Sequence, residues 1–524
     1  MKEAGVSSAS RRAAKVNRLM AVVDCGSSSV RAFIAEPSSK IGDDYRVLED
    51  LSVPVDLTEG FLVGKLSRAA MDGVARAIEG IQQAARSYGI TTLRAVATSA
   101  LREATNSDVL VEHIRNRLGV SLEVIDNAEE ARLYVQALGV MLRRLDRDLP
   151  GRTLLVDIGG GSTCVTVLED GKLVFSVDEH FGTLRLHEQF KELRDSIDYN
   201  ITVDRYSLGA ARMMLSRLPE GSIDRLVVTG GDVRRLYALV TGKMPEAIAE
   251  ISIAAIAAWH HRMQPLTPAA RAEACACEVR DAALLMSAAS LLLHLGHDLG
   301  SENIFVPQLT LRDGLVADQL PGAHGPHHLD DAQLLAEARQ LVKRYGGHLD
   351  YAENTAELAV QIFDQTSELH GLGARERTLL RFSALVHDIG SYINVRNRHK
   401  HTMYIVQAAD LAGLTRQEKD MVANIARYHR KSPPEPHHVA FQELARRSRV
   451  IVSCLASILR MAYALDVERT QRIRKIHCTV SGNRLLLHVD RRQIALESWS
   501  VAGKAGMFEE VFGLTVEVLP REEL

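Results

Sequence analysis

The sequence has few cysteines, few aromatic residues and almost no net charge. Its 524 residues contain six scattered cysteines, and the pair Cys275-Ala-Cys277 has the wrong spacing for a zinc knuckle. Aromatic residues make up only 5%, which disfavours base stacking on single-stranded nucleic acid. A net charge of -3 creates no strong overall field. We therefore expect reduced thiols, a cytoplasmic location, no disulfide scaffold and no specific nucleic-acid partner.

Long apolar runs are also scarce. No uninterrupted run reaches the ~18 residues that span a bilayer. The nearest, Ala282–Leu295, is shorter and has helical periodicity, so we expect a buried helix there and no membrane span. Residues 1–17 are polar and lack the apolar core of a signal peptide, which predicts a flexible tail.

A glycine-rich motif is the strongest positive feature. Leu154–Val167, LLVDIGGGSTCVTV, reads as strand, tight turn and returning strand. Arg18–Glu36 repeats this order, and its Asp24 stands 133 positions before Asp157. Two such copies indicate an internal duplication whose halves face each other across a cleft.

These turns can bind phosphate, because glycines let backbone N–H groups converge on an anion while hydroxyls add donors. One turn alone is also compatible with an ordinary hairpin, whereas the pair favours a phosphate cleft. A third Gly-Gly turn precedes a predicted helix. The candidate phosphate-binding residues are Asp24, Gly26, Ser27, Ser28, Gly159, Gly160, Gly161, Ser162, Thr163, Gly230 and Gly231. Asp24 and Asp157 are the candidate ligands of Mg²⁺ or Mn²⁺.

The alternation of strands and helices over residues 18–320 predicts an α/β protein in two similar halves. Beyond it the pattern becomes helical. The expected parts are a tail (1–17), half I (18–150), half II (151–320), a linker (321–329), an all-α domain (330–470) and a small α/β region (471–524). Strands are expected in that last region at LLLHV, ALESW and TVEVL. The expected helices of the all-α domain are Asp330–Tyr345, Tyr351–Leu369, Ala374–Val386, Thr402–Ala412, Arg416–Tyr428 and Ala445–Leu465.

The all-α domain carries a His-Asp pair and two basic clusters. His387 and Asp388 end a predicted helix, and Asp466 is a candidate distant ligand, but the first histidine that such a metal site needs is missing. Basic residues gather at 396–401 and again at 427–431. Such clusters favour a polyanion channel over an ordinary solvated surface. The channel candidates are Arg398, Lys400, His401, Arg430 and Lys431.

Nine motifs occur in order: DCGSSSVRA, ATSALREATN, NAEEARL, DIGGGST, TGGDVRRL, LRDGL, ALVHDIG, RHKHTMYI and ARYHRK. Together they resemble the exopolyphosphatase / guanosine pentaphosphate phosphohydrolase (Ppx/GppA) family, part of the actin, sugar kinase and Hsp70 ATPase-like superfamily. This resemblance implies duplicated actin-like (ribonuclease H-like) halves and an HD-type helical domain, to which the strand-like runs at the end of the sequence add a small α/β cap. It also implies a homodimer.

The resemblance further implies release of orthophosphate from the ends of inorganic polyphosphate, and hydrolysis of guanosine pentaphosphate to the tetraphosphate. Glu130 matches the glutamate that activates the attacking water, with Glu129 a weaker candidate. Arg102 matches the arginine that meets substrate phosphate.

Two departures from the family pattern support an alternative. Cys164 stands where the family has glutamate, and Tyr351 stands where HD proteins carry their first metal-binding histidine. The alternative is a regulator that binds polyphosphate or guanosine tetra- or pentaphosphate with little or no hydrolysis.

Overall fold

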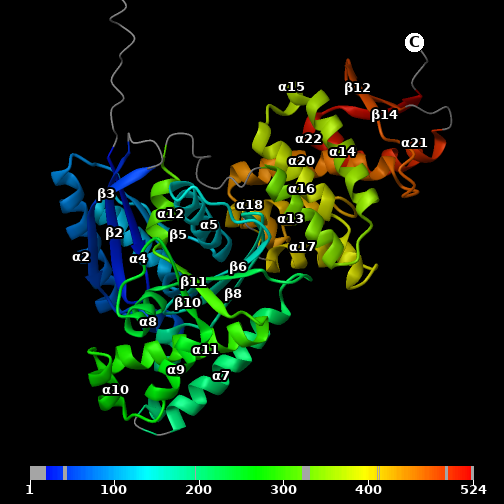
Figure 1. Ribbon diagram of the computed structural model, residues 1–524. Coiled ribbons are helices and arrows are strands. Elements are labelled where there is room, and N and C mark those ends of the chain that lie inside the picture. Colours follow the sequence, from blue (N-terminus) through cyan, green and yellow to red (C-terminus); the bar gives the residue numbers. More distant parts are fainter. Residues whose placement is uncertain are drawn as a thin grey trace, which may run out of the picture. The chain divides into compact units, whose positions relative to one another are not determined.

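The structure is a computed structural model that describes residues 19–38, 44–194, 196, 198–320, 331–409, 411, 413–489 and 494–520. The predicted tail (1–17) and linker (321–329) lie outside the described residues. The chain divides into two compact units, one built chiefly from residues up to 320 and the other chiefly from residue 331 onward (Figure 1).

The first sheet of the first unit is built around a hairpin. Its strands, in the order β3-β2-β1-β4-β5, are β3 (Tyr45–Pro54), β2 (Ser29–Pro37), β1 (Met20–Cys25), β4 (Arg94–Ala97) and β5 (Leu122–Val124). Strands β1 and β2 are antiparallel, with Asp24 opposite Arg31, whereas β4 and β5 run parallel to β1. The predicted strand-turn-strand at Arg18–Glu36 is confirmed.

The second sheet repeats this arrangement. Its order is β10-β11-β9-β6-β7-β8, with β10 (Ile248–Ser252), β11 (Asn303–Pro307), β9 (Arg225–Thr229), β6 (Arg152–Ile158), β7 (Thr163–Glu169) and β8 (Lys172–Glu179). Strands β6 and β7 form the antiparallel hairpin, and β9 runs parallel to β6 as β4 does to β1. The shared order confirms the predicted duplication, with β10 as an added antiparallel edge.

Helices cover the two sheets. They are α1 (Thr58–Leu62), α2 (Arg68–Ser87), α3 (Ser99–Glu103), α4 (Ser107–Leu118), α5 (Asn127–Arg144), α6 (Thr183–Gln189), η2 (Lys191–Leu193), α7 (Asp198–Ser216), α8 (Gly231–Thr241), α9 (Ile253–Met263), α10 (Pro268–Ala274), α11 (Val279–Leu299) and α12 (Leu311–Ala317). Helix α2 packs on β1 and β2 (Figure 1). Along β1, Val23 joins the core on one face and Val22 the core on the other, because successive strand side chains point to opposite faces.

Two described helices, α11 and α20 (Arg446–Leu465), are long and apolar enough to cross a membrane by length and composition alone. In the most apolar 18-residue stretch of each helix, 72% of α11 and 78% of α20 is buried inside the fold. Helix α11 extends the buried helix predicted at Ala282–Leu295, and both helices have the burial of core helices.

The second unit is mostly helical. Its helices are α13 (Asp331–Arg344), α14 (Leu349–Gln365), α15 (Ser367–His370), α16 (Ala374–Val386), η3 (Ile389–Tyr392), α17 (Arg398–Ala408), α18 (Arg416–Arg427), α19 (Val439–Gln442), α20, α21 (Ala495–Ala502) and α22 (Gly506–Phe512). Its sheet has the order β12-β13-β14, with β12 (Ile476–Ser481), β13 (Arg484–Val489) and β14 (Thr515–Pro520). One continuous apolar core joins these helices and strands.

One secondary-structure prediction in the second unit is wrong. The stretch ALESW, expected as a strand, belongs to helix α21. Its buried residues Glu497, Ser500 and Val501 follow helical spacing. The error arose because a run of five residues is too short for its period to separate helix from strand.

Helix α12 depends on a glycine for its close approach to α5. A Cβ added to Gly314 would clash with the backbone carbonyl of Leu133. We predict that Gly314→Ala lowers the free energy of unfolding by about 1 to 3 kcal/mol, because backbone cannot move aside cheaply. The matched control is Gly80→Ala, at an exposed position of α2 with nothing near the new Cβ. This change should raise the free energy of unfolding by up to about 1 kcal/mol. Chemical unfolding of both variants checks the contrast, and equal effects would contradict it.

Candidate functional site

The first unit contains a cavity of 410 Å³ lined by residues of both halves. The turn after β1, the end of β4 and the start of α5 contribute from the first half. The turn after β6, the turn before α8 and the start of α11 contribute from the second. The turns of the two duplicated hairpins therefore open into one space.

The two hairpin turns are closed in the same way. The Gly26 N–H donates to the Ser29 carbonyl at 3.0 Å, and the Gly159 N–H donates to the Ser162 carbonyl at 2.9 Å. The turns also pack tightly, since a Cβ on Gly161 would lie 2.5 Å from the Ser99 hydroxyl oxygen. The repeated sequence thus produces a repeated backbone geometry.

Glu130 reaches this cavity from the first turn of α5. Arg102 Nη1 donates to Glu130 Oε2 at 3.0 Å and to the Ile125 carbonyl at 3.0 Å. The second guanidinium nitrogen, Nη2, lies 3.9 Å from Asp178 Oδ2. Arg102 itself is not part of the cavity lining, so in this structure it holds the glutamate rather than facing the cavity.

Asp157 is a buried carboxyl and Asp24 a half-buried carboxyl of the same cavity. Burial, together with the nearby negative charge of Glu130, raises the pKa of Asp24 to about 6 and that of Asp157 to about 7. Asp157 Oδ1 has no hydrogen-bond partner among the described residues. Two neighbouring carboxyls, one of them with an unsatisfied oxygen, form a site where a positive charge would be favourable.

The carboxylates of Asp24 and Asp157 fit a cation that takes its other ligands from substrate and water. Among the described residues no group of three or more His, Cys, Asp or Glu side chains could hold a metal ion. Mg²⁺ is usually bound by one or two carboxylates, with phosphate oxygens and waters completing the shell. Asp24 and Asp157 are the residues that could hold it.

Most predicted phosphate-binding residues line the cavity: Asp24, Gly26, Ser27, Ser28, Gly159, Gly160, Ser162, Gly230 and Gly231. Gly230 has φ of 132°, and a Cβ there would clash with the Ile158 carbonyl, so this turn presses against β6. Two predicted residues are not in the lining. Gly161 packs against Ser99, and the buried Thr163 hydroxyl donates to the Phe181 carbonyl at 2.7 Å.

Sequence reasoning missed the arginines of the cavity, which are Arg31, Arg234, Arg235 and Arg280. Guanidinium groups match the geometry of phosphate oxygens. Arg31 was recoverable, because the register of a hairpin with a tight turn makes it the cross-strand neighbour of Asp24. Arg234 and Arg235, in α8, directly follow the third Gly-Gly turn and were also recoverable from their place in that motif. Arg280 comes from α11, and no local signal connected it to the glycine-rich turns.

Cys164 lies beside the candidate cation site. It is opposite Asp157 in the β6–β7 register and is part of the cavity lining. The residue is buried, and its Sγ lies 3.7 Å from Thr166 Oγ1. A glutamate at this position would add a further carboxyl to the cavity.

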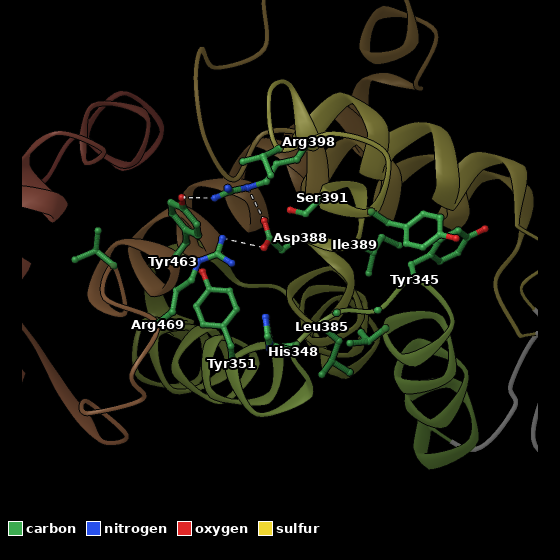
Figure 2. A pocket seen from close by; sticks show the side chains of 17 residues that line it. Tyr345, His348, Tyr351, Leu385, Asp388, Ile389, Ser391, Arg398, Tyr463 and Arg469 are labelled. Atoms are coloured by element: carbon green, nitrogen blue, oxygen red, sulfur yellow. Dashed lines mark hydrogen bonds and ion pairs between the residues drawn. The ribbon is translucent and has the colours of Figure 1, made fainter.

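In the second unit Asp388 of the His-Asp pair contacts two arginines (Figure 2). Asp388 Oδ1 lies 2.5 Å from Arg398 Nε, and Asp388 Oδ2 lies 2.8 Å from Arg469 Nη2. Asp466 accepts hydrogen bonds from Asn354 Nδ2 and from two backbone N–H groups. Buried His387 lies 3.4 Å from the Tyr351 hydroxyl. Of the three residues predicted for this site, Asp388 thus contacts two arginines, Asp466 accepts from amide N–H groups and His387 contacts a tyrosine hydroxyl.

The two basic clusters converge around His399. Burial and the positive charges of Arg430, Lys400, Arg427 and Lys431 lower the pKa of His399 to about 4. His429 is fully buried with a pKa well below its usual value, mainly because of burial, so both histidines are neutral at pH 7. Lys400 and Lys431 are exposed, whereas His401 and Arg430 are half-buried.

Arg398 differs from the other channel candidates. Its side chain is only 11% exposed and is paired with Asp388. The basic surface therefore consists of the neighbouring lysines and arginines without it.

Residues 47–323 match the model of the Ppx/GppA phosphatase family, and residues 336–500 match Ppx/GppA phosphatase, domain III. The chain is 26% identical over 483 residues to a guanosine-5'-triphosphate,3'-diphosphate pyrophosphatase of Aeromonas hydrophila, covering 86% of this chain and 88% of that one. The protein of the same name from Photobacterium profundum is 23% identical over 446 residues, covering 83% and 86%.

A solved structure of an exopolyphosphatase-like protein has a TM-score of 0.50 at 22% identity, covering 58% of this chain and 97% of that chain. This likeness supports the fold of duplicated actin-like halves. Since the first family model alone covers more than half of the sequence, the protein belongs to the Ppx/GppA phosphatase family and is a phosphoanhydride hydrolase.

Proposed function

We propose that the cavity of the first unit hydrolyses the terminal phosphoanhydride of inorganic polyphosphate, releasing orthophosphate, and acts likewise on guanosine pentaphosphate to give the tetraphosphate. The observation that carries this proposal is the presence of both matching turns, Glu130 and four arginines in one cavity. The names of the relatives support the guanosine substrate. The basic surface at Lys400, Arg430 and Lys431 supports binding of long polyanions.

In this proposal Glu130 is the general base. Phosphoryl transfer needs an oriented water and stabilisation of charge on the phosphoryl oxygens. Glu130 would accept the proton of the attacking water, and its ion pair with Arg102 would fix the carboxylate in the cavity. Serine hydroxyls of the turns and the guanidinium groups would bind the phosphate chain. When bound by Asp24 and Asp157, Mg²⁺ or Mn²⁺ would supply charge neutralisation of phosphate oxygens.

We predict that Glu130→Gln lowers phosphate release from polyphosphate about 10²- to 10⁴-fold, the range that general bases contribute. Binding of polyphosphate should persist, since the variant keeps the side-chain shape. The neighbouring Glu129→Gln is the matched control, because Glu129 is also buried but outside the cavity lining. A malachite green assay and equilibrium dialysis measure the two quantities. Unchanged turnover in Glu130→Gln would refute the assignment.

Activity should also depend on pH through the buried carboxyls. Since the pKa values of Asp24 and Asp157 are raised to about 6 and about 7, both are protonated in acid and cannot hold a cation there. Phosphate release should therefore rise between about pH 6 and pH 7. A bound cation favours the ionised forms, so increasing Mg²⁺ should move the midpoint to lower pH. Rate profiles at two Mg²⁺ concentrations test this, and a midpoint independent of Mg²⁺ would contradict it.

A second candidate function is a sensor that binds these phosphate compounds with little turnover. The specific observation in its favour is Cys164, a thiol in the lining opposite Asp157. Without a carboxyl at this position, the cavity has one fewer group to hold a cation or orient water.

The two functions differ in the response to Cys164→Glu. If the protein is chiefly a sensor, we expect a gain in phosphate release of at least about tenfold, equivalent to about 1.4 kcal/mol in the barrier. If it is already an efficient hydrolase, the change should be small or negative, because a further carboxyl is buried beside Asp157. Cys164→Ser, which alters the thiol without adding charge, is the control. Steady-state assays with polyphosphate and guanosine pentaphosphate separate these outcomes.

A further inference from the structure

The second unit contains a cavity of 490 Å³ that is lined in part by Asp388 (Figure 2). Its walls come from the end of α13, the start of α14, α16 with η3, the start of α17 and the end of α20. Most of the lining is apolar or aromatic, with a few charged groups. This is the composition and size typical of small-molecule sites.

One end of the cavity is lined by two arginines and one aspartate. Arg398 and Arg469 share the single carboxylate of Asp388, which leaves one uncompensated charge among the three groups. The guanidinium of Arg398 also donates to the Tyr463 hydroxyl at 3.0 Å, and that of Arg469 lies 4.7 Å from the centre of the Tyr351 ring. Arginine has five donors, so donors remain for an anionic ligand.

The backbone that presents these arginines is in an unusual conformation. Arg469 has φ of 58°, and Asn397, immediately before Arg398, has φ of 63°. Few residues other than glycine adopt this left-handed region, although asparagine tolerates it, so Arg469 is the unusual residue of the two. Such residues cluster at ligand clamps, and the conformation of Arg469 agrees with a binding role.

The other end is aromatic. Tyr345 and Tyr392 pack edge to face with ring centres 5.5 Å apart, and Tyr392 is 67% exposed. Figure 2 shows Tyr345 and Arg469 at opposite ends of the lining. Between them, the buried hydroxyl oxygen of Ser391 has no hydrogen-bond partner among the described residues. A planar polar ligand could stack on the exposed ring and form a hydrogen bond with the unsatisfied hydroxyl.

We propose that this cavity binds a nucleoside phosphate, with the base against Tyr345 and Tyr392, Ser391 bonded to the base or sugar, and the phosphate on Arg469. Inorganic polyphosphate would leave the tyrosines and the serine unused. A bare cation is disfavoured, because Asp388 is already neutralised by two arginines. The site is independent of the hydrolytic cavity and consists only of residues of the second unit.

The test is photolabelling of the full-length protein with 8-azido-GDP, followed by mass spectrometry of the peptide that contains Tyr345. We expect label on this peptide, blocked by excess GDP more effectively than by the same concentration of tripolyphosphate, which competes only for the phosphate position. Tyr392→Ala should reduce labelling at least tenfold. Tyr404→Ala is the matched control, since Tyr404 is also 67% exposed but lies outside the cavity lining. Arg469→Ala should reduce labelling similarly, and a thermal unfolding curve shows whether that variant remains folded.

Three results would each overturn the proposal. The label could be confined to residues 24–311, or labelling could fall equally in Tyr392→Ala and Tyr404→Ala. The third result is that tripolyphosphate blocks labelling whereas GDP does not. If Arg469→Ala unfolds, the comparison of Tyr392→Ala with Tyr404→Ala still tests the proposal. Phosphate release by Tyr392→Ala is measured in parallel and should match that of the unmodified protein. This separates failure of the nucleotide site from failure of the hydrolytic assignment.

Discussion

Three carboxyl groups gathered in one cavity, of which Asp157 and Glu130 are buried and Asp24 is half-buried, are the constraint on which the first unit depends. Negative charges removed from water and placed near each other are costly. The structure surrounds them with cations, of which Arg102 contacts Glu130 directly, while Arg31 and Arg312 act on Asp24. The raised pKa values show that compensation is incomplete. A cation and a phosphate chain would relieve this imbalance together, which relates the electrostatics to the chemistry of the family.

Much of the fold followed from local sequence signals. The repeated Asp-to-Ser turn predicted both hairpins and the duplication, because glycine-rich turns between alternating apolar residues specify strand, turn and strand. Helix α16 has the predicted bounds, Ala374–Val386. The edge strands β3 and β10 were not predicted. Strand β3 is mostly exposed or half-buried, and β10 is half-exposed and follows a loop, so neither has a strong apolar pattern.

The candidate site was accessible to sequence reasoning only where it is local. The turns, Glu130 and Asp157 were named because they belong to compact motifs. Arg280 was missed, since it joins the cavity through a helix more than a hundred residues beyond the second turn. The role of Arg102 also depends on tertiary contacts: the structure directs its guanidinium to Glu130 and the Ile125 carbonyl, which no spacing predicts. In the second unit, likewise, the partners of Asp388 come from two separate segments.

The distribution of the cavity lining along the chain has a consequence for biosynthesis. The lining begins at Asp24 and ends at Leu311. A nascent chain that has emerged only through the first half has one hairpin turn and Glu130, but neither Asp157 nor the opposing turn. The carboxyls of the first half then remain open to water, and their burial is deferred until the second half folds against them. Assembly of the hydrolytic cavity is therefore a late event that requires nearly the whole first unit.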